Sequence, residues 1–206
     1  VVQYKGDIDL ASCNVTSNAT EPGHGLELLY DGNTDTYFHT VWKDSEVDEE
    51  HYIQVDLGEG ISITEFVWTY TTYTTQWAKD FPTCVEITGS NDALLWTDIK
   101  TLSELPTDQK AEYTSELLGS SEVAYRYLRF TVTGTTSGGK FNEQYYFGLA
   151  EMGLNRSSTS VSRYAEFSSY ITSDEIVAAY EALLDARNVL TTGENYAAAI
   201  ENLQEQ

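Results

Sequence analysis

Apolar and polar residues alternate in several short segments up to residue 156, and turns rich in glycine, asparagine, aspartate and serine separate these segments. The clearest of them are residues 52–57, 61–70, 84–88, 125–133 and 147–154. A period of two places successive side chains on opposite faces of a β-strand. Because no segment of helical periodicity lies between them, the pattern predicts a mainly β fold, an antiparallel sandwich. Trp68 and Trp96 are expected to lie in strands and to pack in the core.

The pattern changes after the last of these strands. Residues 156–162 read Arg-Ser-Ser-Thr-Ser-Val-Ser, which is typical of a polar linker. Apolar residues then recur at helical spacing from Ser173 to Gly193 and again over residues 196–203, which predicts two helices. Two such helices cannot bury both apolar stripes by themselves, so we expect the chain to belong to a longer protein. The predicted division is a β-sandwich over residues 1–156 and a linker with a small α-helical hairpin over residues 157–206.

The net charge of −22, from 33 acidic and 11 basic residues, narrows the range of partners. Nucleic-acid binding requires clustered lysine and arginine, and the composition argues against it. No apolar stretch approaches the length of a membrane span, so we expect no membrane insertion. The two cysteines, Cys13 and Cys84, are too few for a disulfide scaffold, and the sequence leaves open whether they form one bridge or remain thiols.

A short loop within residues 28–42 contains several oxygen-bearing side chains around an Asp-Gly turn. The oxygens of Asp31, Asn33 and Thr36, with carbonyls of the turn, can converge on a hard cation, which prefers six to eight oxygen ligands. The alternative is an ordinary turn in which Asp31 is solvated.

Aromatic residues and a histidine follow directly after this loop. Phe38, His39 and Trp42 offer the flat faces and the hydrogen-bonding edge that sugar recognition uses. A rigid loop beside such a cluster indicates binding rather than catalysis. Nucleophile-elbow, zinc-protease and phosphate-loop motifs are absent from the sequence, and carboxylates are so abundant that their pairing carries no glycosidase signal.

Five segments, in order along the chain, resemble coagulation factor V/VIII type C (discoidin-like) domains, and among them most closely the bacterial family 32 carbohydrate-binding modules. The matching segments are residues 29–42, 52–58, 85–96, 127–133 and 148–152, so the resemblance spans roughly residues 7–155. It implies a galactose-binding-like jelly-roll sandwich with a glycan site among the loops at one end. The helical tail resembles the FIVAR-type spacers of multimodular surface enzymes, although a simple helical hairpin fits equally well.

The resemblance also implies a structural calcium ion. Its ligands would come from the Asp-Gly-Asn turn and from the start of the closing strand: Leu28, Asp31, Asn33, Thr36, Ala150 and Glu151. Such an ion would tie the loop to the last strand and neutralise two carboxylates. The alternative leaves Asp31 and Glu151 facing water.

For the sugar, the resemblance implies a site around His39 and Trp42. The other residues expected there are Glu21 in the preceding loop, Tyr145 or Tyr146 before the closing strand, and Tyr73 and Trp77 as further aromatic platforms. An arginine that the family places after the next strands is missing, and Gln76, Lys79 or Asp80 could replace it. The alternatives are a buried His39 that supports the cation loop and a core Trp42. His24 and His51 are interpreted as loop residues without partners.

These features predict a non-catalytic, calcium-stabilised carbohydrate-binding module. We expect it to deliver a secreted or cell-surface multimodular protein, of the bacterial glycan-degrading type, to terminal galactose- or N-acetylhexosamine-containing glycans, and to be monomeric in isolation. A discoidin-like adhesion domain that binds a protein is the alternative, and a hydrolytic domain is a third.

Overall fold

A computed structural model describes residues 8–43, 46–59 and 61–156, together with the single residue 182. Its elements are η1 (Leu10–Ser12), β1 (Asn14–Ser17), η2 (Leu26–Leu29), β2 (Phe38–His39), β3 (Tyr52–Asp56), β4 (Glu65–Thr71), β5 (Pro82–Ser90), β6 (Thr97–Ser103), β7 (Glu112–Thr114), β8 (Leu118–Gly119), β9 (Tyr127–Thr135), β10 (Lys140–Phe141), β11 (Gln144–Tyr145), β12 (Gly148–Leu149) and β13 (Glu151–Arg156). The predicted linker, the helical hairpin and the FIVAR-like tail lie outside the described residues.

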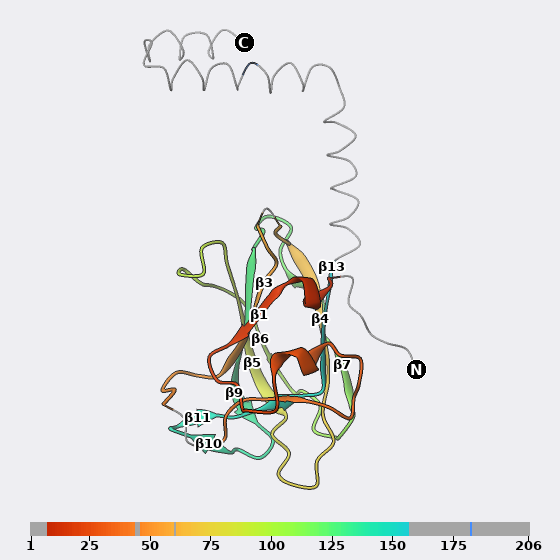
Figure 1. Ribbon diagram of the computed structural model, residues 1–206. Helices are drawn as coiled ribbons and strands as arrows, with labels where there is room; N and C mark the ends of the chain where they lie inside the picture. The colour runs from red at the N-terminus through yellow and green to blue at the C-terminus, as the bar shows by residue number, and fades with distance from the viewer. Residues whose placement is uncertain (1–7, 44–45, 60, 157–181, 183–206) are drawn as a thin grey trace. The chain divides into compact units, whose positions relative to one another are not determined.

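Two antiparallel sheets form the body of the domain (Figure 1). One sheet has the strand order β1-β3-β9-β5-β6, and the other has β13-β4-β7 with β8 also paired to β4. Two small pairs, β2 with β12 and β10 with β11, lie among the loops. The mainly β, antiparallel sandwich predicted from the sequence is therefore confirmed.

The alternation along β3 and β9 shows how the sequence directs one face of the larger sheet inward. Ile53 and Val55 are buried, whereas Tyr52, Gln54 and Asp56 between and beside them are partly exposed. The adjacent strand β9 of the same sheet alternates in the same way, and the pairs Ile53–Phe130 and Val55–Leu128 place apolar side chains side by side on the inner face. A slip of one residue would expose this apolar set, so the pattern fixes the register.

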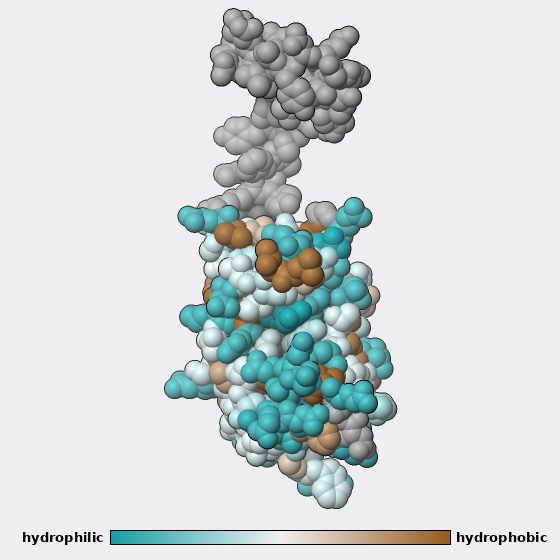
Figure 2. All heavy atoms as spheres, turned by 90° about the vertical axis from the view of Figure 1, so that its left-hand side faces the viewer, coloured by the Kyte–Doolittle hydropathy of each residue, from teal (hydrophilic) through white to brown (hydrophobic). Residues whose placement is uncertain are grey.

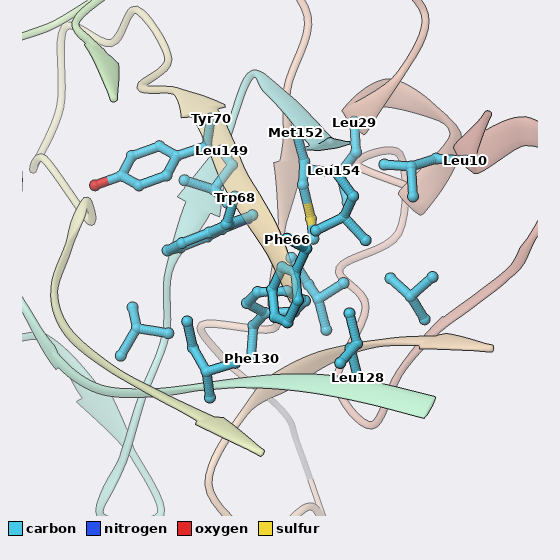
Figure 3. Close-up of a cluster of buried hydrophobic side chains, with 14 of the residues drawn as sticks. Leu10, Leu29, Phe66, Trp68, Tyr70, Leu128, Phe130, Leu149, Met152 and Leu154 are labelled. Carbon is cyan, nitrogen blue, oxygen red and sulfur yellow. The ribbon is translucent and has the colours of Figure 1, made fainter. Parts of the chain in front are cut away.

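The core between the sheets is rich in aromatic side chains (Figure 3). Trp68 on β4 is 1% exposed, and its ring centroid lies 4.7 Å from that of Tyr70 and 5.0 Å from that of Phe130 across the sandwich. The core position predicted for Trp68 is confirmed. The same prediction for Trp96 is wrong, because Trp96 lies before β6, is partly exposed, and stacks on the guanidinium of Arg129 at 4.0 Å.

Both cysteines are free thiols. Cys13 precedes the edge strand β1, whereas Cys84 lies on β5, and β3 and β9 separate these two strands in the sheet. Burial raises the pKa of the Cys13 thiol.

The face of the domain shown in Figure 2 is mostly hydrophilic or intermediate in hydropathy, with apolar side chains gathered in small patches. Within the part of the chain that is described, no helix is long and apolar enough to cross a membrane.

Candidate functional site

Several loops meet at the end of the sandwich where β4 ends and β5 begins. Residues 72–81 connect these two strands, and residues 136–147 leave the neighbouring end of β9. The pair β2–β12 joins the loop before β2 to this end through the register His39–Gly148. A side chain at position 148 would not fit, because a Cβ there would lie 2.6 Å from the His39 ring and 2.9 Å from Tyr73. Glycine at this position therefore lets the two loops approach closely.

A pocket of about 450 Å³ opens between these loops. Its walls are aromatic side chains, two histidines, one carboxylate and small residues: His24, Tyr37, His39, Trp42, Tyr73, Thr75, Trp77, Ala78, Asp80 and Tyr146. The volume lies within the range of small-molecule sites, roughly 300–1,000 Å³.

The aromatic rings of the pocket surround His39. The centroid of its imidazole lies 4.9 Å from that of Trp42, 5.8 Å from that of Tyr73 and 6.2 Å from that of Tyr146. Tyr37 and Tyr73 stack at 4.3 Å. Trp77 is 80% exposed, so its whole ring is available at the rim.

His39 and Asp80 form the polar floor. The Nδ1 atom of His39 lies 2.6 Å from the carbonyl oxygen of Thr40, an acceptor, and therefore carries a proton. Its Nε2 atom lies 3.4 Å from Oδ2 of Asp80, while Ser137 donates its hydroxyl proton to the other oxygen of that carboxylate. The backbone N–H of Asp80 also donates to the Tyr73 hydroxyl at 3.2 Å. These bonds hold the carboxylate against the ring although the two residues are far apart in the sequence.

The negative charge of Asp80 affects the pKa values of two nearby tyrosines, Tyr146 and Tyr37. Burial, and after it the Asp80 charge, raises the pKa of Tyr146. The same two causes, in the same order, raise the pKa of Tyr37. Both phenols are therefore neutral hydrogen-bonding groups at physiological pH.

A pair of carboxylates lies outside this pocket, where the Asp-Gly turn meets β13. Burial, and after it the hydrogen-bonded Asp31 carboxylate, raises the pKa of Glu151 to about 7. Oxygen Oε1 of Glu151 is buried without a hydrogen-bond partner among the described residues. Thr36 donates its hydroxyl proton to Asp31 and to the Asn33 carbonyl, each at 2.7 Å, so these oxygens lie together.

The sequence was compared with profiles of known protein families. The profile of the family described as F5/8 type C domain matches residues 13–145. The chain belongs to this family. A comparison with curated protein sequences finds no significant match.

Solved structures share the F5/8 type C fold of this chain at low sequence identity. The module CpGH89CBM32-5 of Clostridium perfringens, in complex with GalNAc-β-1,3-galactose, has a TM-score of 0.54 at 16% identity, over 72% of this chain and 98% of that one. CBM32-3 from a family 31 glycoside hydrolase of the same organism has a TM-score of 0.56 at 18% identity, over 72% and 94%. The family 32 module of NanJ, again from C. perfringens and in complex with galactose, has a TM-score of 0.51 at 18% identity, over 70% and 94%.

Five of the sugar-site residues predicted for this F5/8 type C domain line the pocket: His39, Trp42, Tyr73, Trp77 and Tyr146. The other two do not line it. Glu21 is buried and donates its backbone N–H to the His39 carbonyl at 3.0 Å. Tyr145 lies in β11 opposite Lys140, whose ammonium lies 4.3 Å from its ring. Of the three residues considered as replacements for the missing arginine, Asp80 lies in the pocket.

Sequence reasoning missed Tyr37 and underestimated His24. Alternation along β2 could have found Tyr37, because Phe38 is fully buried and its neighbours Tyr37 and His39 point to the other side. The interpretation of His24 as a loop residue without partners is wrong. Its Nδ1 lies 3.2 Å from the Tyr37 carbonyl, and its ring lies 4.4 Å from that of Tyr37.

The carboxylate pair of the F5/8 type C domain fits a hard cation in the chemistry of its donors. Among the described residues, no group of three or more His, Cys, Asp and Glu side chains could hold a metal ion. A cation at Asp31 and Glu151 would therefore depend on hydroxyl and carbonyl oxygens as well, which calcium accepts and zinc does not prefer. The unpartnered Oε1 of Glu151 is the atom that such an ion would satisfy. Leu28 lies in η2, which contacts β13, and Ala150 is fully buried directly before β13.

Proposed function

We propose that this chain is a non-catalytic glycan-binding module and that the pocket around His39 holds a terminal sugar. The observation that carries the proposal is the combination of aromatic faces with the His39–Asp80 floor in one open pocket. Aromatic faces stack on the C–H face of a pyranose, while imidazole and carboxylate bind its hydroxyls. Two structures that share the fold were solved with galactose-containing sugars, which supports the same class of ligand here.

The pocket composition favours binding over hydrolysis. Glycoside hydrolysis ordinarily requires two carboxyl groups on either side of the scissile bond. Asp80 is the single carboxylate among the described residues that line this pocket. A sugar held there by one stacked ring and a few hydrogen bonds binds weakly, and attachment gains strength when several modules are linked in one protein. We propose in addition that the module belongs to a secreted or cell-surface multimodular protein.

A glycan array on the whole chain, followed by titration of its best ligand, tests this function. Trp42→Ala is expected to weaken binding by about 1–3 kcal/mol, the scale of removing a buried aromatic contact. Trp96→Ala is the matched control, because this residue is also a partly exposed tryptophan but lies outside the pocket. If Trp42→Ala and Trp96→Ala bind the array ligand equally well, the sugar site does not lie at Trp42. An array without any glycan ligand would favour the adhesion alternative.

We further propose that calcium binds at Asp31 and Glu151 and ties the loop after η2 to β13. A ligand that binds only the folded state stabilises it by mass action, by about 2.7 kcal/mol at a free concentration one hundred times its Kd. Calcium is therefore expected to raise the melting temperature of the wild type, and a chelator to lower it.

Variants separate this binding from a general charge effect. Asp31→Ala and Glu151→Ala should each abolish the response of the melting temperature to calcium. Glu112→Ala, which removes an exposed carboxylate from β7, separated from β13 by β4, should leave that response intact. A wild-type melting temperature that is the same in calcium and in chelator would rule the ion out.

A further inference from the structure

The outer face of the larger sheet holds an arginine in contact with two aromatic rings. Arg129 and Gln54 are register partners on the adjacent strands β9 and β3, and each stands between buried residues of its strand. Their side chains therefore lie on the face opposite the core. The guanidinium carbon of Arg129 lies 4.1 Å from the ring centroid of Tyr52 and 4.0 Å from that of Trp96. Cation–π attraction to these two rings holds the guanidinium in place.

The hydrogen bonds of Arg129 use only part of its donor set. Its Nε and Nη2 atoms both donate to the side-chain oxygen of Gln54, at 3.2 and 2.8 Å. A guanidinium has five N–H donors, so the two on Nη1 and the second one on Nη2 remain. Within the described part of the chain, no acceptor is hydrogen-bonded to these three donors. One N–H on Nη1 and one on Nη2 are parallel, and this fork matches the two oxygens of a carboxylate.

The positive charge of Arg129 is not paired with a carboxylate. Arg126, at the start of the same strand, binds both oxygens of Asp56 at 2.7 and 2.9 Å. By contrast, no Asp or Glu of the described residues forms an ion pair with Arg129, in a chain that has 33 acidic residues. Because Arg129 and its two aromatic neighbours are partly exposed, a ligand from solvent can reach this cation.

The surroundings of Arg129 favour one kind of anion. The net charge of −22 repels polyanions and doubly charged phosphates more strongly than it repels a group with a single charge. The planar N–H fork fits the planar carboxylate. The rings of Tyr52 and Trp96 lie beside the fork and offer aromatic surface to the C–H groups of a pyranose.

We propose that Arg129, Tyr52 and Trp96 form a second binding site, which takes the carboxylate of an acidic sugar. The carboxylate accepts both N–H groups of the Arg129 fork, and the pyranose ring lies against the aromatic side chains. None of these three residues lines the pocket around His39, so the inference does not depend on the function proposed for that pocket.

Titration of the nitrogen-labelled whole chain at neutral pH and constant ionic strength tests this site. The ligands are the methyl glycosides of glucuronic and galacturonic acid and their neutral parent glycosides. Acetate supplies a carboxylate without a sugar, and N-acetylalanine supplies a carboxylate of the peptide type. Affinity is measured from the shift of the indole N–H signal of Trp96. By this signal the uronides are expected to bind about tenfold more tightly than the parent glycosides, the scale of one charge-assisted hydrogen bond.

Arg129→Lys keeps the positive charge and removes the planar fork. This variant should lower the affinity for the uronides to that of the parent glycosides. Lys100→Gln, which removes the charge of an exposed lysine on β6, controls for net charge and should keep the preference for the uronides. Equal melting temperatures establish that both variants are folded. If Arg129→Lys unfolds, the ligand series on the wild type still decides.

Three results would overturn the inference. The first is a Trp96 signal that the uronides leave in place or that the parent glycosides shift at equal concentration. The second is acetate or N-acetylalanine that binds as tightly as the uronides, because the site would then recognise a carboxylate without the sugar. The third is a folded Arg129→Lys that binds the uronides as the wild type does.

The same spectra keep this inference separate from the function proposed for the pocket. A pocket ligand without a carboxylate is expected to shift the signals of Trp42 and Trp77 and to leave Trp96 in place. Failure of the uronides at Trp96 overturns the second site and leaves those pocket shifts unaffected. Failure of every sugar at Trp42 and Trp77, with the Trp96 response retained, overturns the pocket function and supports the second site.

Discussion

Replacing Trp68 by alanine is expected to lower the free energy of unfolding by about 3–5 kcal/mol, the cost measured for removing a large aromatic side chain from a packed core. The side chain is 1% exposed and packs between Tyr70 on its own strand and Phe130 on the opposite sheet. It therefore joins the two layers of the sandwich, and its loss leaves a cavity that neither sheet can close alone. Urea denaturation, monitored by circular dichroism, measures the change.

Trp77→Ala is the control for this loss. It removes the same side chain from a position that is 80% exposed, and the expected change is within about 0.5 kcal/mol. Equal destabilisation by the two substitutions would contradict the assignment of Trp68 to the shared core.

Acid should destabilise this domain through His51. The residue is 0% exposed, and its two ring nitrogens have no hydrogen-bond partner among the described residues. Burial, and after it the charge of His39, lowers the pKa of His51 from 6.5 to about 4. A lowered folded-state pKa means that its contribution is complete above pH 6.5 and is lost as the pH falls toward 4. The loss amounts to about 3 kcal/mol at the lower end.

The substitution His51→Leu isolates the contribution of His51 to the pH dependence of the unfolding free energy. The variant keeps an apolar side chain in the site and cannot take up the proton. Its unfolding free energy relative to the wild type should therefore improve by about 3 kcal/mol between pH 7 and pH 4. Parallel pH profiles for the two proteins would show that His51 is not the group that titrates.

The larger strands could be predicted because their burial alternates. Residues 52–57 and 125–133 were expected as strands, and the structure places β3 and β9 there with this alternation. Strands such as β2 and β12 have two residues each, and no period can be recognised over that length. The edge strand β6 has mostly exposed side chains, so its sequence lacks the alternation of apolar and polar residues that indicates a strand.

The site was predicted where it depends on local spacing and missed where it depends on the fold. His39 and Trp42 are three residues apart, and both line the pocket. The contact of His39 with Asp80 arises only because the loop between β4 and β5 folds back onto β2. Membership of a loop does not determine side-chain direction either, since Glu21 lies near His39 through its backbone and is buried outside the pocket lining.

The four tryptophans offer the most direct test of the proposal that the pocket binds sugar. Each indole N–H gives its own signal in a nitrogen–proton correlation spectrum, and titration of the labelled protein with the best array ligand follows all of them together. Trp42 and Trp77 line the pocket, whereas Trp68 is buried in the core and Trp96 lies beside Arg129. If the pocket binds sugar, the Trp42 and Trp77 signals are expected to shift saturably while those of Trp68 and Trp96 remain in place. Shifts confined to Trp96, with Trp42 and Trp77 unmoved at saturation, would contradict this proposal.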